Sequence, residues 1–248
     1  MESAARITGT GSAFPERRMT NDDIAQELTR FGLKTDNQWI IDRTGIMERR
    51  VSNIENPAET NSSLGARAAE IALERAGRKP EDIDQIIYAT CSPDTLLPST
   101  ACWLQQKIGA RRAWAMDINA ACSGFIYGVV TAEQFIRSGH SKTVLVLGAE
   151  VLSHFINWQD RTICILFGDG AGAAVVERVG ARARSITNIP RTAAVKKSAS
   201  SRGSADRWRS PSRRRATRWS PSTRSSSAGA AAPARSSRRS TPWSAPRW

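Results

Sequence analysis

The chain changes character at residue 179, and this break limits what it can fold into. Residues 179–248 contain no Leu, Phe or Tyr and are dominated by Arg, Ser, Ala and Pro. A segment of this composition cannot bury enough apolar surface to offset its conformational entropy. We therefore expect one globular domain over residues 1–178 and a disordered basic tail over residues 179–248.

The formal net charge of +13 belongs to the tail. Residues 179–248 carry 17 Lys and Arg against one Asp, whereas residues 1–178 carry 19 Lys and Arg against 22 Asp and Glu. Two origins of the tail stay open. It is either an arm whose Arg and Trp contact nucleic acid, or a stretch of a GC-rich gene that is read out of frame. The abrupt onset favours the shifted reading frame, so we do not expect nucleic acid as a partner.

The first residues do not form a signal peptide, because no basic stretch is followed by an apolar run. No stretch approaches the ~18 apolar residues of a membrane span. We therefore expect a cytoplasmic protein that does not enter a membrane. The four cysteines show no Cys-x-x-Cys spacing, so we expect free thiols rather than disulfides or a metal site. They are Cys91, Cys102, Cys122 and Cys164.

Apolar periodicity predicts strands alternating with helices in the first 178 residues. Near-continuous apolar runs over 85–91, 112–118 and 143–148 are typical of strands buried in a central sheet. This alternation predicts an α/β layered domain. We expect helices after Thr20, Asp36 and Thr60, over 99–109, and from the turn around Cys122 to Gly139, and a last strand after the glycines of 168–172. Gly9 and Gly11 lack the third glycine of a dinucleotide-binding motif, so we reject that motif.

Cys122 lies between the apolar segment 112–118 and the helical pattern that follows it. Ala120, Ala121, Ser123 and Gly124 are small, so the chain can turn sharply there and leave room for a substrate. The unpaired N–H groups and the macrodipole at a helix N-terminus favour a thiolate, which can attack a thioester carbonyl. The alternative is that Cys122 is a buried core residue.

Trp39 and Arg43 are four residues apart and share one face of a predicted helix. An aromatic ring beside a guanidinium suits stacking on an adenine ring and binding of its phosphates. The alternative, a core Trp and a solvated Arg, is favoured by these two residues when they are taken alone.

Five stretches together resemble the N-terminal half of a β-ketoacyl-acyl-carrier-protein synthase III, a family of the thiolase superfamily. They follow the family's order and are residues 9–12, 36–46, 98–102, 119–125 and 167–174. The resemblance implies a thiolase-like fold, in which two similar α/β halves form a layered sandwich, usually in a homodimer. This chain would hold the first half.

The resemblance also implies a reaction. The active cysteine is acylated by an acyl-CoA primer, malonyl on acyl carrier protein loses carbon dioxide, and its carbanion attacks the acyl-enzyme. The product is a 3-oxoacyl-acyl carrier protein, and the reaction initiates fatty-acid synthesis. Acyl-CoA and malonyl-acyl carrier protein are substrates, and no cofactor is expected. A related condensing enzyme, such as a polyketide starter enzyme, stays open.

The resemblance assigns roles to seven residues of this sequence. Cys122 is the acylated nucleophile, and its backbone N–H is one donor to the oxyanion. Leu97 stands where many members have a bulky aromatic residue that reaches across the dimer and limits the primer. The remaining residues are Trp39, Arg43 and Arg161, which bind CoA, and Leu166 and Phe167, which line the pocket near the pantetheine arm.

The chain departs from the family in one respect that bears on activity. The family's catalytic His and Asn come from stretches that look like Pro-His-Gln-Ala-Asn and Gly-Asn-Thr-Ser, and neither occurs in this sequence. His140 and His154 match neither position, so we expect them to lie at the surface or to be satisfied by hydrogen bonds. The chain as written is therefore expected to be a truncated, inactive fragment. It is also expected to be poorly soluble, because the helix after Cys122 would expose an apolar face.

Overall fold

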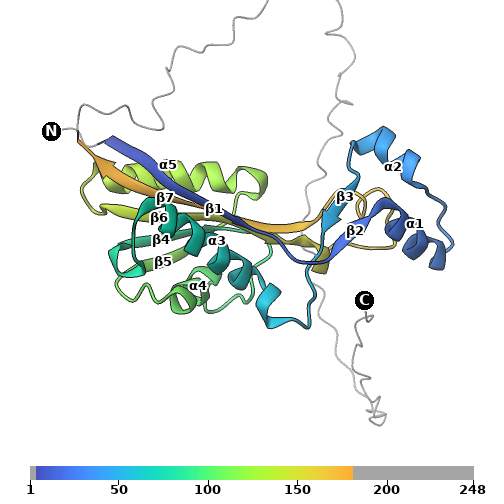
Figure 1. The fold of residues 1–248 in the computed structure, drawn as a ribbon, viewed down its shortest axis with the longest axis horizontal. Coiled ribbons are helices and arrows are strands. Elements are labelled where there is room, and N and C mark those ends of the chain that lie inside the picture. The colour runs from blue at the N-terminus through green and yellow to red at the C-terminus, as the bar shows by residue number, and fades with distance from the viewer. Residues whose placement is uncertain (1–3, 181–248) are drawn as a thin grey trace, which may run out of the picture. The chain divides into compact units, whose positions relative to one another are not determined.

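A computed structural model describes residues 4–180. Its centre is a five-stranded sheet in the order β1–β7–β6–β4–β5 (Figure 1). β4 pairs in parallel with β5 and β6, whereas β7 is antiparallel to β1 and β6. This mixed sheet with helices confirms the predicted α/β class. The strands are β1 (Ala4–Ala13), β4 (Gln85–Ala89), β5 (Trp114–Ile118), β6 (Thr143–Val151) and β7 (Asp169–Val179).

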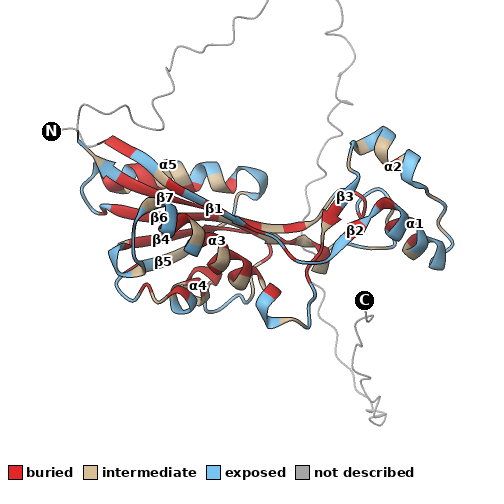
Figure 2. Cartoon of the chain, viewed as in Figure 1, coloured by how far each residue is buried: buried red, intermediate tan, exposed pale blue. Residues whose placement is uncertain are grey.

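Helices cover both faces of this sheet (Figure 1). α3 (Asn61–Ala76) and α4 (Thr100–Ile108) lie on one face, and α5 (Gly124–Arg137) lies on the other. Along β4, Ile86 and Tyr88 belong to the core beneath α3 and α4, and Ile87 belongs to the core beneath α5. Figure 2 shows the central strands as largely buried. Burial on both faces explains why these strands have continuous apolar sequences.

A second, two-stranded sheet lies beside the first few helices. It pairs β2 (Arg18–Thr20) with β3 (Glu48–Arg50) and carries α1 (Asn21–Arg30) and α2 (Asn37–Thr44). Its core also contains Cys164 and Ile165, so the segment before β7 packs onto this part of the molecule. The sequence did not predict this sheet, since three-residue strands show no periodicity. The core comprises Met19, Ile24, Leu28, Ile40, Val51, Cys164 and Ile165.

The predicted helix starts are confirmed by their caps. The Thr20 hydroxyl accepts a hydrogen bond from the backbone N–H of Asp23, in a capping box. Asp36 accepts from the N–H of Trp39 at the start of α2, and Gly45 ends that helix in the left-handed conformation. Thr60 caps α3 in the same way as Thr20 caps α1.

Strand boundaries were predicted less well. β6 continues to Val151 rather than ending at Gly148, and β5 begins at Trp114 rather than at residue 112. Gly170 and Gly172 lie within β7, not ahead of it, because they pair there with Glu150 and Gly148 of β6. Four 3-10 turns complete the elements: Pro57–Glu59, Pro80–Asp82, Ala121–Ser123 and Leu152–His154.

Gly9 and Gly11 have a packing role. A Cβ added to either residue would collide with backbone carbonyl oxygens of α3, those of Ala72 and Ala68. These glycines therefore allow β1 to pass close beneath α3, which agrees with the rejection of a dinucleotide site.

The predicted tail, residues 179–248, lies outside the described residues except for its first two. Val179 is the last residue of β7, so the folded segment continues one residue beyond the predicted boundary at 178. Among residues 4–180, no helix combines the length and apolarity needed to cross a membrane.

Candidate active site

Cys122 lies in the 3-10 turn Ala121–Ser123, which leads directly from β5 into α5. The sequence predicted a position in the first turn of a helix, and the structure adds that this turn is a 3-10 turn. The Cys122 side chain is exposed. The alternative of a buried core cysteine is therefore wrong, and the thiol is accessible to a substrate.

The backbone before Cys122 is strained. Ala121 has a φ of 46°, a left-handed conformation that costs a non-glycine residue on the order of 1–3 kcal/mol. Its N–H donates to the Asn119 side-chain oxygen at 3.3 Å, and the N–H of Ser123 donates to the Ala120 carbonyl at 3.1 Å. Strain of this kind gathers at functional sites, where the surrounding structure holds it.

Two glycines seat α5 on the sheet. A Cβ on Gly124 would lie 3.0 Å from the Cβ of Ala89, and a Cβ on Gly128 would lie 2.9 Å from Cγ1 of Val146. The N-terminal turn of α5 therefore lies directly over the end of β4. This contact places Cys122 at the carboxyl edge of parallel strands β4 and β5, the edge where ligands of open α/β sheets bind.

Asp117, on β5, fixes the neighbouring helix at the same edge. Its carboxylate accepts hydrogen bonds from the N–H groups of Thr100 at 2.8 Å and Ala101 at 2.7 Å. A carboxylate suits this place because the first N–H groups of a helix lack partners within the helix. The sequence analysis missed this contact.

A buried polar network lies beneath the segment that follows β4. The Asn61 amide donates to the Thr90 hydroxyl at 2.9 Å and to the Ser92 carbonyl at 2.7 Å. The Tyr88 hydroxyl donates to the Asn61 side-chain oxygen at 2.6 Å, and burial raises the pKa of Tyr88. On the other side of the segment lies Glu150 of β6, which also escaped the sequence analysis.

The predicted CoA residues form a second cluster. The guanidinium carbon of Arg43 lies 4.0 Å from the centroid of the Trp39 ring, and that of Arg161 lies 4.7 Å from it. Arg161 also donates to the Lys34 carbonyl at 2.7 Å. Trp39 is half-buried and packs against the core of α1 and α2. Both readings of Trp39 therefore hold in part, because its ring packs in a core and also carries two cations.

The three predicted pocket residues differ in exposure. Leu166 is 46% exposed, and Phe167 is half-buried two residues before β7. Arg49 of β3 holds this segment by donating to the Ile165 carbonyl at 2.9 Å. Leu97 is 89% exposed on the loop between β4 and α4, so it packs little against the described residues 4–180.

Both histidines have structural partners, as predicted. Nε2 of His154 lies 2.8 Å from the Ser52 hydroxyl, which donates to Asp169 at 2.8 Å. This is not a catalytic triad, because the carboxylate bonds the serine and not the imidazole. His140 lies against the rings of Trp114 and Phe135.

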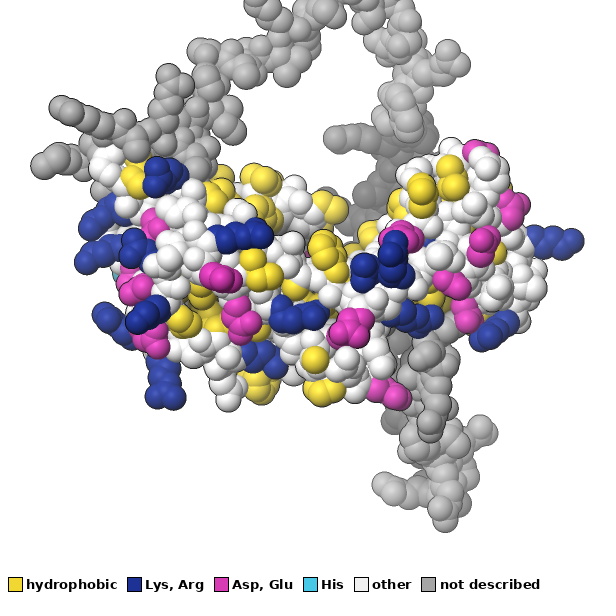
Figure 3. Space-filling view, in the orientation of Figure 1, with side chains coloured by type: hydrophobic (Ala, Val, Ile, Leu, Met, Phe, Trp, Pro, Cys, Tyr) yellow, Lys and Arg dark blue, Asp and Glu magenta, His cyan; other side chains and the backbone are white. Residues whose placement is uncertain are grey.

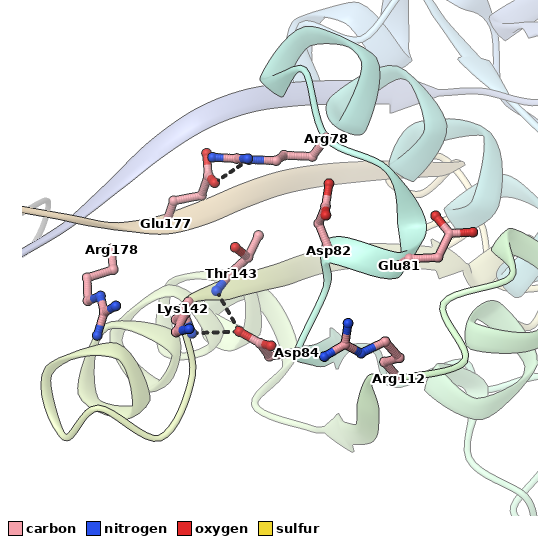
Figure 4. A pocket seen from close by; sticks show the side chains of 9 residues that line it. All are labelled: Arg78, Glu81, Asp82, Asp84, Arg112, Lys142, Thr143, Glu177 and Arg178. Carbon is pink, nitrogen blue, oxygen red and sulfur yellow. Dashed lines mark hydrogen bonds and ion pairs between the residues drawn. The ribbon is translucent and has the colours of Figure 1, made fainter.

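A cavity of about 360 Å³ opens at the opposite edge of the sheet (Figure 4). Asp84 there accepts from the backbone N–H groups of Lys142 and Thr143, and Arg78 pairs with Glu177 at 2.6 Å. The lining holds four cations and four carboxylates and no Cys or His. Because its charges balance and it contains no nucleophile, this cavity is a poor candidate for the chemistry. The described residues also contain no cluster of three His, Cys, Asp or Glu that could hold a metal ion.

Comparison with known proteins points to one family. Residues 116–190 match the family model of 3-oxoacyl-[acyl-carrier-protein] synthase III. A β-ketoacyl-[acyl-carrier-protein] synthase III of Caldanaerobacter subterraneus is 52% identical over 176 residues, which are 71% of this chain and 51% of that protein.

Solved structures agree with this match. The 3-oxoacyl-[acyl-carrier-protein] synthase III of Aquifex aeolicus aligns with a TM-score of 0.65 at 46% identity, over 71% of this chain and 54% of that one. A priming β-ketosynthase of the R1128 polyketide pathway aligns with a TM-score of 0.66 at 34% identity, over 72% and 51%. The fold is therefore thiolase-like, and the chain spans about half the length of these relatives.

Proposed function

The described part of this chain matches the N-terminal half of a β-ketoacyl-acyl-carrier-protein synthase III, and on that premise we propose that Cys122 accepts an acyl group from acyl-CoA. The observation that carries the proposal is the exposed thiol beside the strained Ala121, at the start of α5. The wider activity is an acyltransferase reaction that primes fatty-acid synthesis.

The acyl transfer is a thioester exchange. The Cys122 thiol loses its proton, and its sulfur attacks the thioester carbonyl of acyl-CoA to give a tetrahedral oxyanion. The backbone N–H of Cys122, in the first turn ahead of α5, is the proposed donor to this oxyanion. The carbon–sulfur bond to CoA then breaks, and the CoA thiolate takes up a proton from solvent.

Trp39, Arg43 and Arg161 are the proposed CoA site. A ring with guanidinium groups at 4.0 and 4.7 Å offers a surface for adenine and two positive charges for phosphates. Leu166 and Phe167 are proposed to line the path of the pantetheine arm, and Leu97 to help set the primer pocket.

Condensation with malonyl-acyl carrier protein is the second proposed step. It needs the His and Asn of the two stretches that this sequence lacks, so the 248 residues as written are proposed to stop at the acyl-enzyme. The same premise makes acyl carrier protein the second partner, a homodimer the assembly and the cytoplasm the compartment.

The missing stretches are proposed to lie in another reading frame of the same gene. Resequencing across codons 170–190 tests this. An added or missing base that restores Pro-His-Gln-Ala-Asn and Gly-Asn-Thr-Ser supports the full condensing enzyme. A gene that reads as written leaves the acyl-accepting half alone and favours a truncated fragment.

Acylation is tested directly by incubating the purified chain with acetyl-CoA and measuring its intact mass. The expected result is one added acetyl group that hydroxylamine removes and that Cys122→Ala abolishes. An unchanged mass, or equal labelling of Cys122→Ala, contradicts the proposed function.

A further inference from the structure

Two exposed thiols lie at one edge of the sheet. Cys91 follows β4 and Cys122 follows β5, and these strands are parallel neighbours in which Ala89 pairs with Ile118. The backbone N–H of Thr90 extends the pairing by donating to the Ile118 carbonyl at 3.1 Å. An acyl-CoA that reaches Cys122 therefore approaches a second accessible thiol, and something must decide which one reacts.

Glu150 binds the segment that carries the second thiol. One oxygen of its carboxylate accepts from the backbone N–H of Cys91 at 2.8 Å and from the Cys91 thiol at 3.2 Å. The other oxygen accepts from the hydroxyls of Thr90, at 3.2 Å, and Ser92. Thr90 and Ser92 are buried while Cys91 is exposed. The carboxylate thus holds residues 90–92 in place and takes the Cys91 S–H as one of four donors.

This contact opposes ionisation of Cys91. A Cys91 thiolate would lie 3.2 Å from a carboxylate oxygen, and like charges at that separation repel strongly in a partly desolvated place. Burial raises the pKa of Cys91 to about 11, and the hydrogen bond and charge of Glu150 add to this, with a smaller contribution from Cys122. The titratable groups that act on Cys91 are therefore Glu150 on β6 and Cys122 on the turn before α5. Since the thiolate is the nucleophile, Cys91 is a poor acyl acceptor.

We propose that Glu150 is a positioning residue that keeps Cys91 a hydrogen-bonded thiol, so that Cys122 is the one thiol at this edge that takes the acyl group. This inference rests on the proposed function, because it explains the selectivity of acylation at that site.

The test compares Glu150→Gln with Glu70→Gln, which makes the same change at an exposed position of α3. Each protein is alkylated with iodoacetamide at pH 8, and tryptic peptides report the rate at each cysteine. In Glu150→Gln we expect Cys91 to react about tenfold faster, since each unit of pKa changes the thiolate fraction tenfold. Cys122 should change less than twofold, and Glu70→Gln should match the unmodified protein. With acetyl-CoA, Glu150→Gln should acquire acyl groups on both cysteines.

A second measurement needs no substitution and remains decisive if Glu150→Gln does not fold. In the unmodified protein, the alkylation rate of Cys91 should keep rising with pH to about 10.5, as its pKa of about 11 requires. A rate that levels off near pH 9, or a folded Glu150→Gln whose Cys91 reacts no faster, overturns the inference. If these results hold but acetyl-CoA labels no cysteine, the proposed function fails by itself.

Discussion

The guanidinium carbon of Arg161 lies 4.7 Å from the centroid of the Trp39 ring. The two residues come from distant segments, since Trp39 is on α2 and Arg161 precedes β7. Packing of Cys164 and Ile165 into the core of α1 and α2 brings them together. The proposed CoA site is therefore assembled by tertiary packing, and a ring with positive charge on its surface waits for a flat, anionic ligand.

Replacing Trp39 should weaken CoA binding. Trp39→Ala removes the stacking surface, and stacking of one base on an aromatic side chain contributes about 1–3 kcal/mol, so we expect Kd to rise about tenfold or more. Isothermal titration calorimetry with CoA measures this. Arg161→Ala should weaken binding as well, because it removes a charge from the phosphates. Arg30→Ala, an exposed change on α1, serves as the control. A Trp39→Ala protein that binds CoA with unchanged affinity contradicts the assignment.

Filling the contact between α5 and the sheet should destabilise the fold and disturb Cys122. In Gly128→Val the new side chain would overlap Cγ1 of Val146, and such overpacking typically costs about 1–3 kcal/mol. Urea unfolding measures the loss of stability, and acetyl-CoA labelling should fall with it. Gln134→Ala, on the exposed side of α5, should stay within about 0.5 kcal/mol of the unmodified protein. Equal stability of Gly128→Val would show that α5 does not approach the sheet this closely.

The cap of α1 should make stability depend on acid pH. Asp23 accepts from the backbone N–H and the hydroxyl of Thr20, both at 2.7 Å, and these bonds hold the pKa of Asp23 below its ordinary value of 3.8. The folded-state pKa is thus lower than the unfolded one. The stabilisation is present above the unfolded pKa and is lost as pH falls through the folded pKa.

Asp23→Asn should therefore be less stable than the unmodified protein at pH 7, and the gap should narrow below pH 4. Urea unfolding at pH 7, 5 and 3 measures the gap. Asp22→Asn, in the same turn, is the matched control and should show a smaller pH-dependent gap. A gap for Asp23→Asn that stays constant from pH 7 to pH 3 would contradict this account of the cap.

The outer face of α5 should make the chain associate with itself. Ile126, Tyr127 and Val130 are 60%, 57% and 41% exposed, and Figure 3 shows hydrophobic side chains gathered over this helix. The double variant Ile126→Glu/Val130→Glu should lower the average mass seen in sedimentation velocity, because charged side chains oppose burial of this face. Gln134→Glu adds a charge to the same helix without touching the apolar face and should leave the mass unchanged. An unmodified chain that sediments as a monomer would refute the prediction.

Much of the fold could be predicted because its signals are local. Thr20, Asp36 and Thr60 mark helix starts by their side chains, and Gly45 marks a helix end. The central strands are read from continuous apolar runs. The exposed turn at Cys122 follows from small residues between a strand and a helix. In each case the residues that decide the structure are adjacent in the sequence.

The parts that sequence reasoning missed depend on distant residues. Glu150 stands in a strand that reads as buried, and its role comes from Thr90, Cys91 and Ser92 on another segment. The pairing of β2 with β3 has the same character. Arg161 entered through the resemblance and not through spacing, because nothing in its own segment links it to Trp39. A charged residue inside an apolar strand was the one signal that could have pointed to Glu150.

The most direct test of the account is to find which cysteine carries the acyl group. After incubation with acetyl-CoA and digestion with trypsin, Cys122 lies in the peptide of residues 113–137, where it is the one cysteine. Cys91 and Cys102 fall in the peptide before it, and Cys164 in the peptide of residues 162–178. We predict that the acetyl group appears on residues 113–137 and nowhere else. Acetyl found on another cysteine peptide, or on none, would contradict the assignment of Cys122 as the nucleophile.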